Sequence, residues 1–574
     1  MAAVIAAKNC HQLGGRLRRT AASSIAVTAV VATLMALALA YWLWFGLGVR
    51  GIHFDDGVSI LATQGILEHG YSKLPSGFFY NRGHIPHYLV AGSIQVFGLN
   101  NLSIMLPSLV MGLGSLLMVH LIAKGILGRP WLGVAAIILL LALEMQTWYA
   151  TGPRMYMTLQ FFTLLAVYST WRGHVEGRGK FKVLAVLAII AAMLSHREAV
   201  ILVVALPATA LILMWLKGQE WSKILSFQNV LSLLPLVLVT LLVLGVGYDV
   251  PNPMQTVVIH DGNVPARQGL NLNPVFWGKH FIHLERTLPY GIALLPIAYF
   301  AAFKSFRRNP SSSHSLIYLL LVFTFTLFLL GLVAKDQVGS RFLFFVLPIN
   351  ALLVCTAGVA VVQFLVPRAN KLFQVSRVDQ VVVLVLLLGG ITMSVALGTL
   401  QAGGGFVGGS ATRHAKAAFA QGPQPAGLAS LGFGTPCGKP SRTCRNDGLT
   451  ALYADLRHSV QPDDLVISAT PMETNFYLGS VDGYLRERKT KDGELTTFDQ
   501  PTDEYFGANL IDSLEELREL RDSNRRVWVI ASSTSSHISQ ESLDLLDNTF
   551  QRYGENGHLL VYVNRMAEET SGVR

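Results

Sequence analysis

Long apolar runs separated by short polar segments occupy the first two-thirds of the chain. A helix needs about 20 mostly apolar residues to cross the hydrocarbon core of a bilayer. Eleven runs approach or reach that length: 24–47, 102–123, 131–150, 155–171, 181–195, 199–216, 230–248, 287–303, 315–334, 342–365 and 379–400. The pattern therefore predicts an α-helical polytopic membrane protein with about eleven transmembrane helices.

Two of the segments between these runs are long, namely 48–101 and 249–286. Within the first, apolar residues at near-helical spacing predict one helix over Gly57–His69. Residues Ile85–Gly98 are predicted to form either a second such helix or a short re-entrant segment. A helix of this kind lies in the membrane interface rather than across it. We therefore expect residues 1–404 to form one membrane domain with two long outer loops.

The pattern changes after the Gly403–Gly405 stretch. Short helices and short strands then alternate, which is typical of an α/β domain with a mainly parallel sheet. The predicted helices are 449–458, 513–522 and 540–553, and the predicted strands are 465–469, 526–532 and 558–563. Residues 405–574 are therefore predicted to be a soluble α/β domain.

Composition and charge support this division. Of the 574 residues, 52% are hydrophobic and 14% charged, whereas a soluble protein carries about 25% charged residues. The net charge of +10 is unevenly divided, with 28 Lys and Arg against 12 Asp and Glu in residues 1–404, and 17 against 23 in residues 405–574. Because the positive charge accompanies the apolar part, it indicates membrane topology and excludes a nucleic-acid partner.

The basic residues also predict the orientation. With the N-terminus in the cytoplasm, 18 of the 28 Lys and Arg of residues 1–404 fall in short inside loops, as the positive-inside rule requires. An odd number of spans then puts residues 405–574 outside the cytoplasm. Cys437 and Cys444 lie close together in that outer region, where a disulfide could form.

Three acidic residues fall near the outer ends of predicted membrane helices. Asp55 and Asp56 follow the first helix, and Glu144 lies near the end of the third. Carboxylates placed together near lipid repel each other and are costly to ionise, so they suggest a functional site. Two structural alternatives stay open: Asp56 could be the N-cap of the following helix, and Glu144 could simply reach water.

Basic residues gather at the same outer ends. They are Arg82, Arg154, His196, Arg197 and Arg341. Cations on the outer side run against the positive-inside rule, and binding of a lipid phosphate explains them. Pairing with the neighbouring Glu198 or Asp336, or reaching for water, remains the alternative for any one of them.

These features occur in an order that resembles a known group. After the acidic pair come Tyr80–Tyr88 (YNRGHIPHY), then Pro153–Tyr156 (PRMY), then Arg341 with Pro348. The order resembles the GT-C glycosyltransferases that use polyprenyl-phosphate sugars, such as protein O-mannosyltransferases and aminoarabinose lipid A transferases, over about residues 25–365. The chain departs from them in having Asp-Asp for the usual Asp-Glu and His84–His87 where many have Lys-Pro-Pro.

The resemblance implies a GT-C fold and transfer of a sugar from a polyprenyl-phosphate donor to a lipid, glycan or protein acceptor, with inversion, on the outer face of the plasma membrane. Asp55 would act as the general base, assisted by Asp56 and Glu144. The five outer cations would hold the donor phosphate. Burial would raise the pKa of Asp55 and a nearby Arg would lower it, and the sequence leaves the outcome open.

The cleavage of the phosphoglycosyl bond supplies the energy for this transfer, so no cofactor is certain, although Asp55, Asp56 and Glu144 could assemble a divalent metal site. Two other functions stay open. A lipid or solute transporter, or flippase, would need polar or broken helices near the bilayer midplane. A non-catalytic assembly subunit would tolerate loss of the Asp55 carboxylate.

Overall fold

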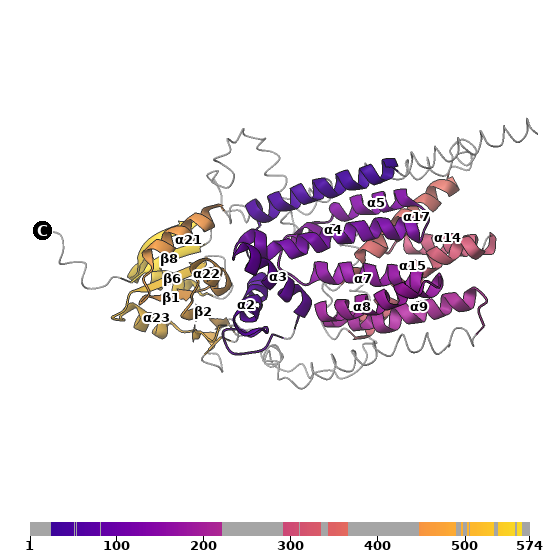
Figure 1. Ribbon diagram of the computed structural model, residues 1–574. Coiled ribbons are helices and arrows are strands. Elements are labelled where there is room, and N and C mark those ends of the chain that lie inside the picture. The colour runs from indigo at the N-terminus through magenta and orange to yellow at the C-terminus, as the bar shows by residue number, and fades with distance from the viewer. Residues whose placement is uncertain are drawn as a thin grey trace, which may run out of the picture.

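The computed structural model describes residues 25–50, 52, 54–80, 82–220, 291–308, 310–333, 343–365, 447–489, 495–496, 502–503, 506–532, 538–556 and 559–564. In this part of the chain, a bundle of long helices carries an α/β unit at one end (Figure 1). Two shorter helices lie between the bundle and the α/β unit.

The bundle begins with the N-terminal helix Ile25–Gly48, whose last turn is the π-helix η1 (Phe45–Val49). It continues with α4 (Asn101–Gly125), α5 (Pro130–Leu141), α6 (Glu144–Ala150), α7 (Tyr156–Thr170), η2 (Trp171–Val175), α8 (Gly179–Ser195), η3 (Arg197–Ile201), α9 (Leu202–Leu216), α14 (Leu295–Arg308), α15 (Pro310–Val333), η4 (Phe344–Val346) and α17 (Leu347–Leu365). Among the described residues, five helices are long and apolar enough to cross a membrane, or six if the bent pair α5–α6 is one span. The predicted spans 230–248 and 379–400 lie outside the described residues, so the total of eleven stays a prediction.

One predicted span differs from the observed structure. The apolar run 131–150 was expected to form one helix, but α5 and α6 are bent by 80° relative to each other. Leu143 has an extended backbone, with φ −82° and ψ 123°, and α6 begins immediately after it at Glu144. The carboxylate of Glu144 is favourable in the first turn of α6. The residues on both sides of the bend are apolar, so hydropathy alone did not predict it.

A buried pair of amides joins the bent segment to the rest of the bundle. Gln146 Nε2 donates to Gln160 Oε1 at 3.1 Å, and Gln160 Nε2 donates to the carbonyl oxygen of Phe344 at 3.2 Å. Both side chains are fully buried. Hydrogen bonds between helices in an apolar bundle fix their register, so these bonds hold α6, α7 and η4 together.

The two helices predicted within the loop 48–101 are confirmed as α2 (Phe54–His69) and α3 (His84–Phe97). Because α2 already begins at Phe54, Asp56 lies inside the first turn and is not the N-cap that the sequence suggested. On α3, Tyr88 and Phe97 are exposed. Exposed aromatic side chains on a short helix at the end of a membrane bundle are typical of the membrane interface.

The α/β unit is built around a six-stranded sheet of order β5-β2-β1-β6-β8-β7. The strands are β1 (Leu465–Ser468), β2 (Gly483–Leu485), β5 (Asn509–Ile511), β6 (Val527–Ser532), β7 (Gln551–Asn556) and β8 (Leu559–Val563), with β3 (Arg488–Lys489) and β4 (Leu495–Thr496) forming a separate pair. The helices are α21 (Asp447–Ser459), α22 (Pro471–Leu478), α23 (Leu514–Arg521) and α24 (Gln540–Thr549). The expected boundary at residues 404–405 lies outside the described residues.

The predicted strands over 465–469 and 526–532 are confirmed, and they pair in parallel as β1 and β6. The predicted helix over 540–553 is too long, because Phe550 is extended and the chain continues as β7. The predicted strand over 558–563 is β8, which runs antiparallel to both β6 and β7. The sheet is therefore parallel over β5, β2, β1 and β6 and antiparallel at its β8–β7 edge.

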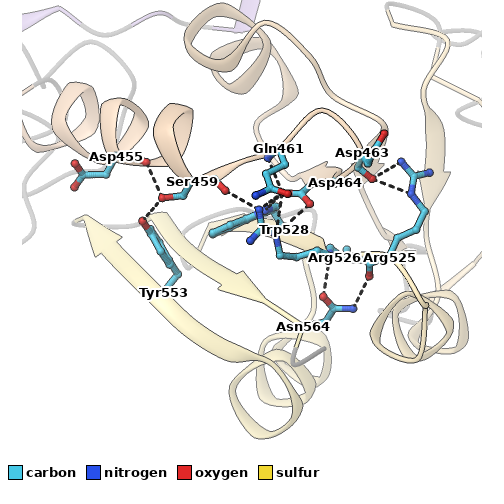
Figure 2. Close-up of polar contacts among 11 residues, drawn as sticks. Asp455, Ser459, Gln461, Asp463, Asp464, Arg525, Arg526, Trp528, Tyr553 and Asn564 are labelled. Atoms are coloured by element: carbon cyan, nitrogen blue, oxygen red, sulfur yellow. Dashed lines mark hydrogen bonds and ion pairs between the residues drawn. The ribbon is translucent and has the colours of Figure 1, made fainter. Parts of the chain in front are cut away.

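A polar clamp ties together the amino ends of the two central strands (Figure 2). Asp464, just before β1, accepts hydrogen bonds from Arg526 Nη2 at 2.7 Å and from Trp528 Nε1 at 2.9 Å. The backbone N–H of Gln461 donates to the same carboxylate at 2.7 Å. Burial raises the pKa of Asp464, but the hydrogen bonds from Arg526, Gln461 and Trp528 outweigh it and hold that pKa below its usual value.

We expect Asp464→Asn to destabilise the α/β unit by about 2 kcal/mol, because hydrogen bonds to a charged group are lost. Since the pKa of Asp464 is lower in the folded state, its contribution is present at neutral pH and is lost as the pH falls below about 4. Hydrogen exchange of β1 and β6 in the full-length protein, corrected for the intrinsic rate, measures both effects. Asp463→Asn is the matched control, because the Asp463 side chain is exposed and Arg525 bonds only to its backbone oxygen.

Candidate functional site

Four charged side chains of alternating sign meet near the C-terminal end of the N-terminal helix. Arg50 Nη2 lies 2.6 Å from Asp56 Oδ2. Arg154 Nη1 lies 4.0 Å from Asp56 Oδ1, and Arg154 Nη2 lies 2.8 Å from Asp55 Oδ2. The order is Arg50, Asp56, Arg154, Asp55, and these four residues are named the ion chain below. Two carboxylates alternate with two guanidinium groups, so each charge has an opposite neighbour.

Burial along the ion chain is graded. The side chains of Arg50, Asp56 and Arg154 are 4%, 1% and 7% exposed, whereas that of Asp55 is 38% exposed. Buried charges are tolerated only when they are paired. Asp55 is thus the member of the ion chain that solvent or a bound molecule can reach, and Asp56 is enclosed between two arginines.

Arg50 was missed by the sequence analysis. Its guanidinium lies 4.6 Å from the centre of the Trp148 ring and against Gly152, where any Cβ would collide with it. Burial lowers the pKa of Arg50 by more than the neighbouring Asp56 raises it. The signal that singled out Arg82 and Arg154, a cation at the outer end of a span, applies equally to Arg50.

Arg154 lies in the connection between α6 and α7. Burial lowers its pKa, but the charges of Asp56 and Asp55 outweigh burial, so the pKa of Arg154 lies above its usual value. The Arg154 guanidinium is 5.4 Å from the centre of the Tyr156 ring, and the Tyr156 ring centre is 5.8 Å from that of His196. The predicted residue His196 is therefore buried one aromatic ring away from the ion chain.

The remaining predicted site residues are not part of the ion chain as it is defined above. Glu144 begins α6 within electrostatic range of Tyr41 on the N-terminal helix. Arg82 lies before α3, within electrostatic range of Tyr80. Arg197 is exposed at the start of η3. Arg341, Cys437 and Cys444 lie outside the described residues.

Two further histidines near this site, His84 and His87, have pKa values below the usual value for histidine. His87 is 1% exposed, and burial together with the nearby His84 lowers its pKa to about 3. Its ring packs against Tyr80 at 5.5 Å between centres. Burial also lowers the pKa of His84. The cationic part of this region is therefore carried by arginine.

A metal site was considered for the three acidic residues. Within the described residues, no three His, Cys, Asp or Glu side chains gather in a way that could hold a metal ion. Two of the three carboxylates, those of Asp55 and Asp56, are instead paired with arginines.

Comparison with known proteins gives a family match and matches to solved structures. The family model described as dolichyl-phosphate-mannose-protein mannosyltransferase matches residues 82–244. The crystal structure of apo ArnT from Cupriavidus metallidurans matches with a TM-score of 0.56 at 15% identity, over 96% of this chain and 100% of that one. The same protein bound to undecaprenyl phosphate matches with a TM-score of 0.56 at 15% identity, over 94% and 99%. No curated protein sequence matches at a significant level.

The match over almost the whole length of both chains shows that they share a fold. The family match to residues 82–244 and this shared fold agree with the resemblance drawn from the sequence. Of the ion chain, the family match includes Arg154, whereas Arg50, Asp55 and Asp56 precede it.

We expect Arg50→Met to destabilise the end of the bundle that carries the α/β unit by about 3 kcal/mol, because it removes the closest partner of a buried carboxylate. Faster hydrogen exchange over α2 in the purified protein would report this loss. The matched control is Arg178→Met, since Arg178 pairs with Glu176 at 3.2 Å but is 51% exposed. An exposed pair contributes about 1 kcal/mol or less. Equal effects of the two variants would contradict a structural role of the ion chain.

Proposed function

We propose that the protein transfers a sugar from a polyprenyl-phosphate donor to an acceptor at the end of the bundle that carries the α/β unit. The single observation that carries the proposal is the ion chain, which presents one accessible carboxylate, Asp55, directly against a buried guanidinium, Arg154. The fold shared with ArnT supports it, because one ArnT structure contains undecaprenyl phosphate. The matched family description names a dolichyl-phosphate donor.

In the proposed reaction, a hydroxyl of the acceptor attacks the anomeric carbon of the donor sugar. The Asp55 carboxylate takes the hydroxyl proton as the new carbon–oxygen bond forms. The bond between the anomeric carbon and the phosphate oxygen breaks, and its electron pair leaves with the phosphate. A single displacement of this kind inverts the configuration of the anomeric carbon.

Arg154 is proposed to stabilise the charge that grows on the departing phosphate. A guanidinium has five N–H donors in a planar fork, so Arg154 can hold Asp55 and still offer donors to a phosphate oxygen. A donor that is already oriented when charge develops contributes most to catalysis. Arg82, His196, Arg197 and Arg341 remain proposed phosphate ligands, and Glu144 a proposed supporting group.

Asp56 has a different proposed role. It is 1% exposed and lies 2.6 Å from Arg50, so a substrate hydroxyl has no access to it in this arrangement. We assign Asp56 to holding Arg154 and Arg50 in place and assign proton transfer to Asp55. The two adjacent carboxylates thus have separate tasks that their sequence positions alone did not distinguish.

The orientation of the chain follows from the ends of the helices. The α/β unit lies at one end of the bundle (Figure 1), and its helix α22 contacts α2, whose Asp55 pairs with Arg154. Arg172, beyond the far end of α7, and Lys217, at the end of α9, lie at the other end. By the positive-inside rule the second end is cytoplasmic. We therefore propose that transfer takes place on the outer face of the plasma membrane.

We expect Asp55→Asn to lower turnover by about 10²–10⁴-fold, because the variant lacks the base. The measurement follows release of lipid phosphate from a panel of radiolabelled polyprenyl-phosphate sugars by purified protein in lipid, with and without cell-envelope extract as a source of acceptor. Glu68→Gln is the matched control, since Glu68 lies on the same helix and its side chain is 70% exposed.

Near-normal turnover of Asp55→Asn would remove Asp55 as the base. Absence of release from every donor, with folded protein and envelope extract present, would contradict the transferase function. A lipid or solute flux assay on the same preparation would then test the transporter alternative.

A further inference from the structure

Helix α22 is anchored in the α/β unit by hydrogen bonds on one of its faces. Thr474 Oγ1 lies 2.9 Å from the hydroxyl oxygen of Tyr453 and 2.7 Å from that of Ser468 at the end of β1. Thr474, Tyr453 and Ser468 are all buried. The helix is therefore held firmly by the sheet from which it emerges.

Another face of α22 presents two apolar side chains to the first loop of the membrane domain. Met472 belongs to an apolar cluster with Val58, Leu61, Ala62 and Leu74. Phe476, one helical turn later, packs on a second cluster formed by Ile52, Ile60, Val90, Ile94 and Ile104. Residues four apart lie on one face of a helix. Met472 and Phe476 therefore contact the two clusters to which α2 contributes. Figure 1 shows α22 next to α2.

The closest approach is at Gly57, directly after the Asp55–Asp56 pair. A Cβ atom at Gly57 would lie 2.9 Å from Met472 Cγ and 3.1 Å from Met472 Sδ. Such short contacts require something to move, so the absence of a side chain at position 57 allows α22 to lie against the first turn of α2.

The α/β unit makes another contact with the same loop. Phe506 packs on the cluster that contains Met472 and Leu74. The adjacent Gly507 lies against Ser76, since a Cβ there would be 3.2 Å from Ser76 Cα. The unit therefore touches both the start of α2 and the segment that follows it.

We propose that Met472 and Gly57 are positioning residues, and that α22 fixes the first turn of α2 so that Asp55 meets Arg154 and the acceptor in reacting geometry. The Asp55–Arg154 distance of 2.8 Å depends on where that turn lies, and a misplacement of about 1 Å can lower turnover on the order of 10²-fold. This inference rests on the proposed function for its activity readout. The described part of the α/β unit then supports the active site by contact, without supplying any of the proposed catalytic residues.

A pair of complementary substitutions tests the contact. Gly57→Ala should lower kcat at least tenfold, with the KM for the donor within about twofold, because the base is displaced while the phosphate ligands stay. Met472→Gly removes the atoms that the new methyl group meets. In the double variant, Gly57→Ala should therefore cause no further loss beyond that of Met472→Gly.

Gly92→Ala is the matched control. Gly92 lies inside α3, and a Cβ there would meet nothing within 4 Å. Normal kcat in Gly57→Ala, or a double variant whose kcat is clearly below that of Met472→Gly alone, would overturn the proposal. An equal loss in Gly92→Ala would also overturn it.

A second substitution covers the case in which Gly57→Ala fails to fold. Phe476→Ala removes the other contact without adding atoms and should also lower kcat. Leu517→Ala is its control, because Leu517 is fully buried in the α/β core on α23. If Leu517→Ala lowers kcat as much as Phe476→Ala, the effect comes from general stability and the proposal is wrong.

Hydrogen exchange over α2 separates this inference from the proposed function. Gly57→Ala should speed exchange in α2, and adding Met472→Gly should remove that difference. This measurement needs no donor. Wild-type protein that releases nothing from any donor would contradict the transferase function, whereas unchanged exchange in Gly57→Ala would contradict the contact itself.

Discussion

The pairing of buried charges at the end of the bundle that carries the α/β unit is the constraint on which the site depends. Removing an ion from water costs several kcal/mol even after the protein relaxes. That cost is offset only where the opposite charge is close, as for Asp56 and Arg50 at 2.6 Å. The ion chain brings together the end of the N-terminal helix, the first turn of α2 and the α6–α7 connection. Burying the charge of any one of these segments without its partners is unfavourable, so the three segments assemble cooperatively.

The same constraint explains local features that look unrelated. The 80° bend between α5 and α6 turns α6 aside, and Trp148 on α6 then covers the guanidinium of Arg50. Gly152 leaves the space that this guanidinium fills. Arg154, two residues later, closes the ion chain on Asp55. The α5–α6 bend, Trp148, Gly152 and Arg154 therefore all serve to pair the carboxylates of Asp55 and Asp56 with arginines.

The sequence predicted the features that follow from the cost of polar groups in lipid. It did not predict which charged side chains pair with one another. Apolar runs predict helices because the bilayer requires satisfied backbone groups, and the helices over 57–69 and 85–98 were found from the same periodicity. Asp55, Asp56 and Arg154 were singled out because charge is costly near lipid. Arg50 and the enclosure of Asp56 were missed, because which cation meets which carboxylate is decided by tertiary packing.

In the α/β unit as well, some features were predicted from the sequence and others were not. Strands β1 and β6 were predicted from their apolar runs, and both are buried. The antiparallel direction of β8 was not predicted, because strand direction follows from the connection through β7 rather than from composition. The contact between α22 and α2 was also not predicted, because no sequence motif in α22 indicates it.

Placement of Asp55 therefore draws on distant parts of the chain. The family match spans residues 82–244 and includes Arg154, yet Asp55 precedes it and Met472 follows it by more than two hundred residues. A short motif around Asp55 could supply a carboxylate but not its geometry. On the proposed function, a site of this kind works only when the bundle supplies the arginine and the α/β unit supplies the surface against which the first turn of α2 rests. The membrane part and the α/β unit would then have to change together, because the backbone at Gly57 belongs to the contact surface of both.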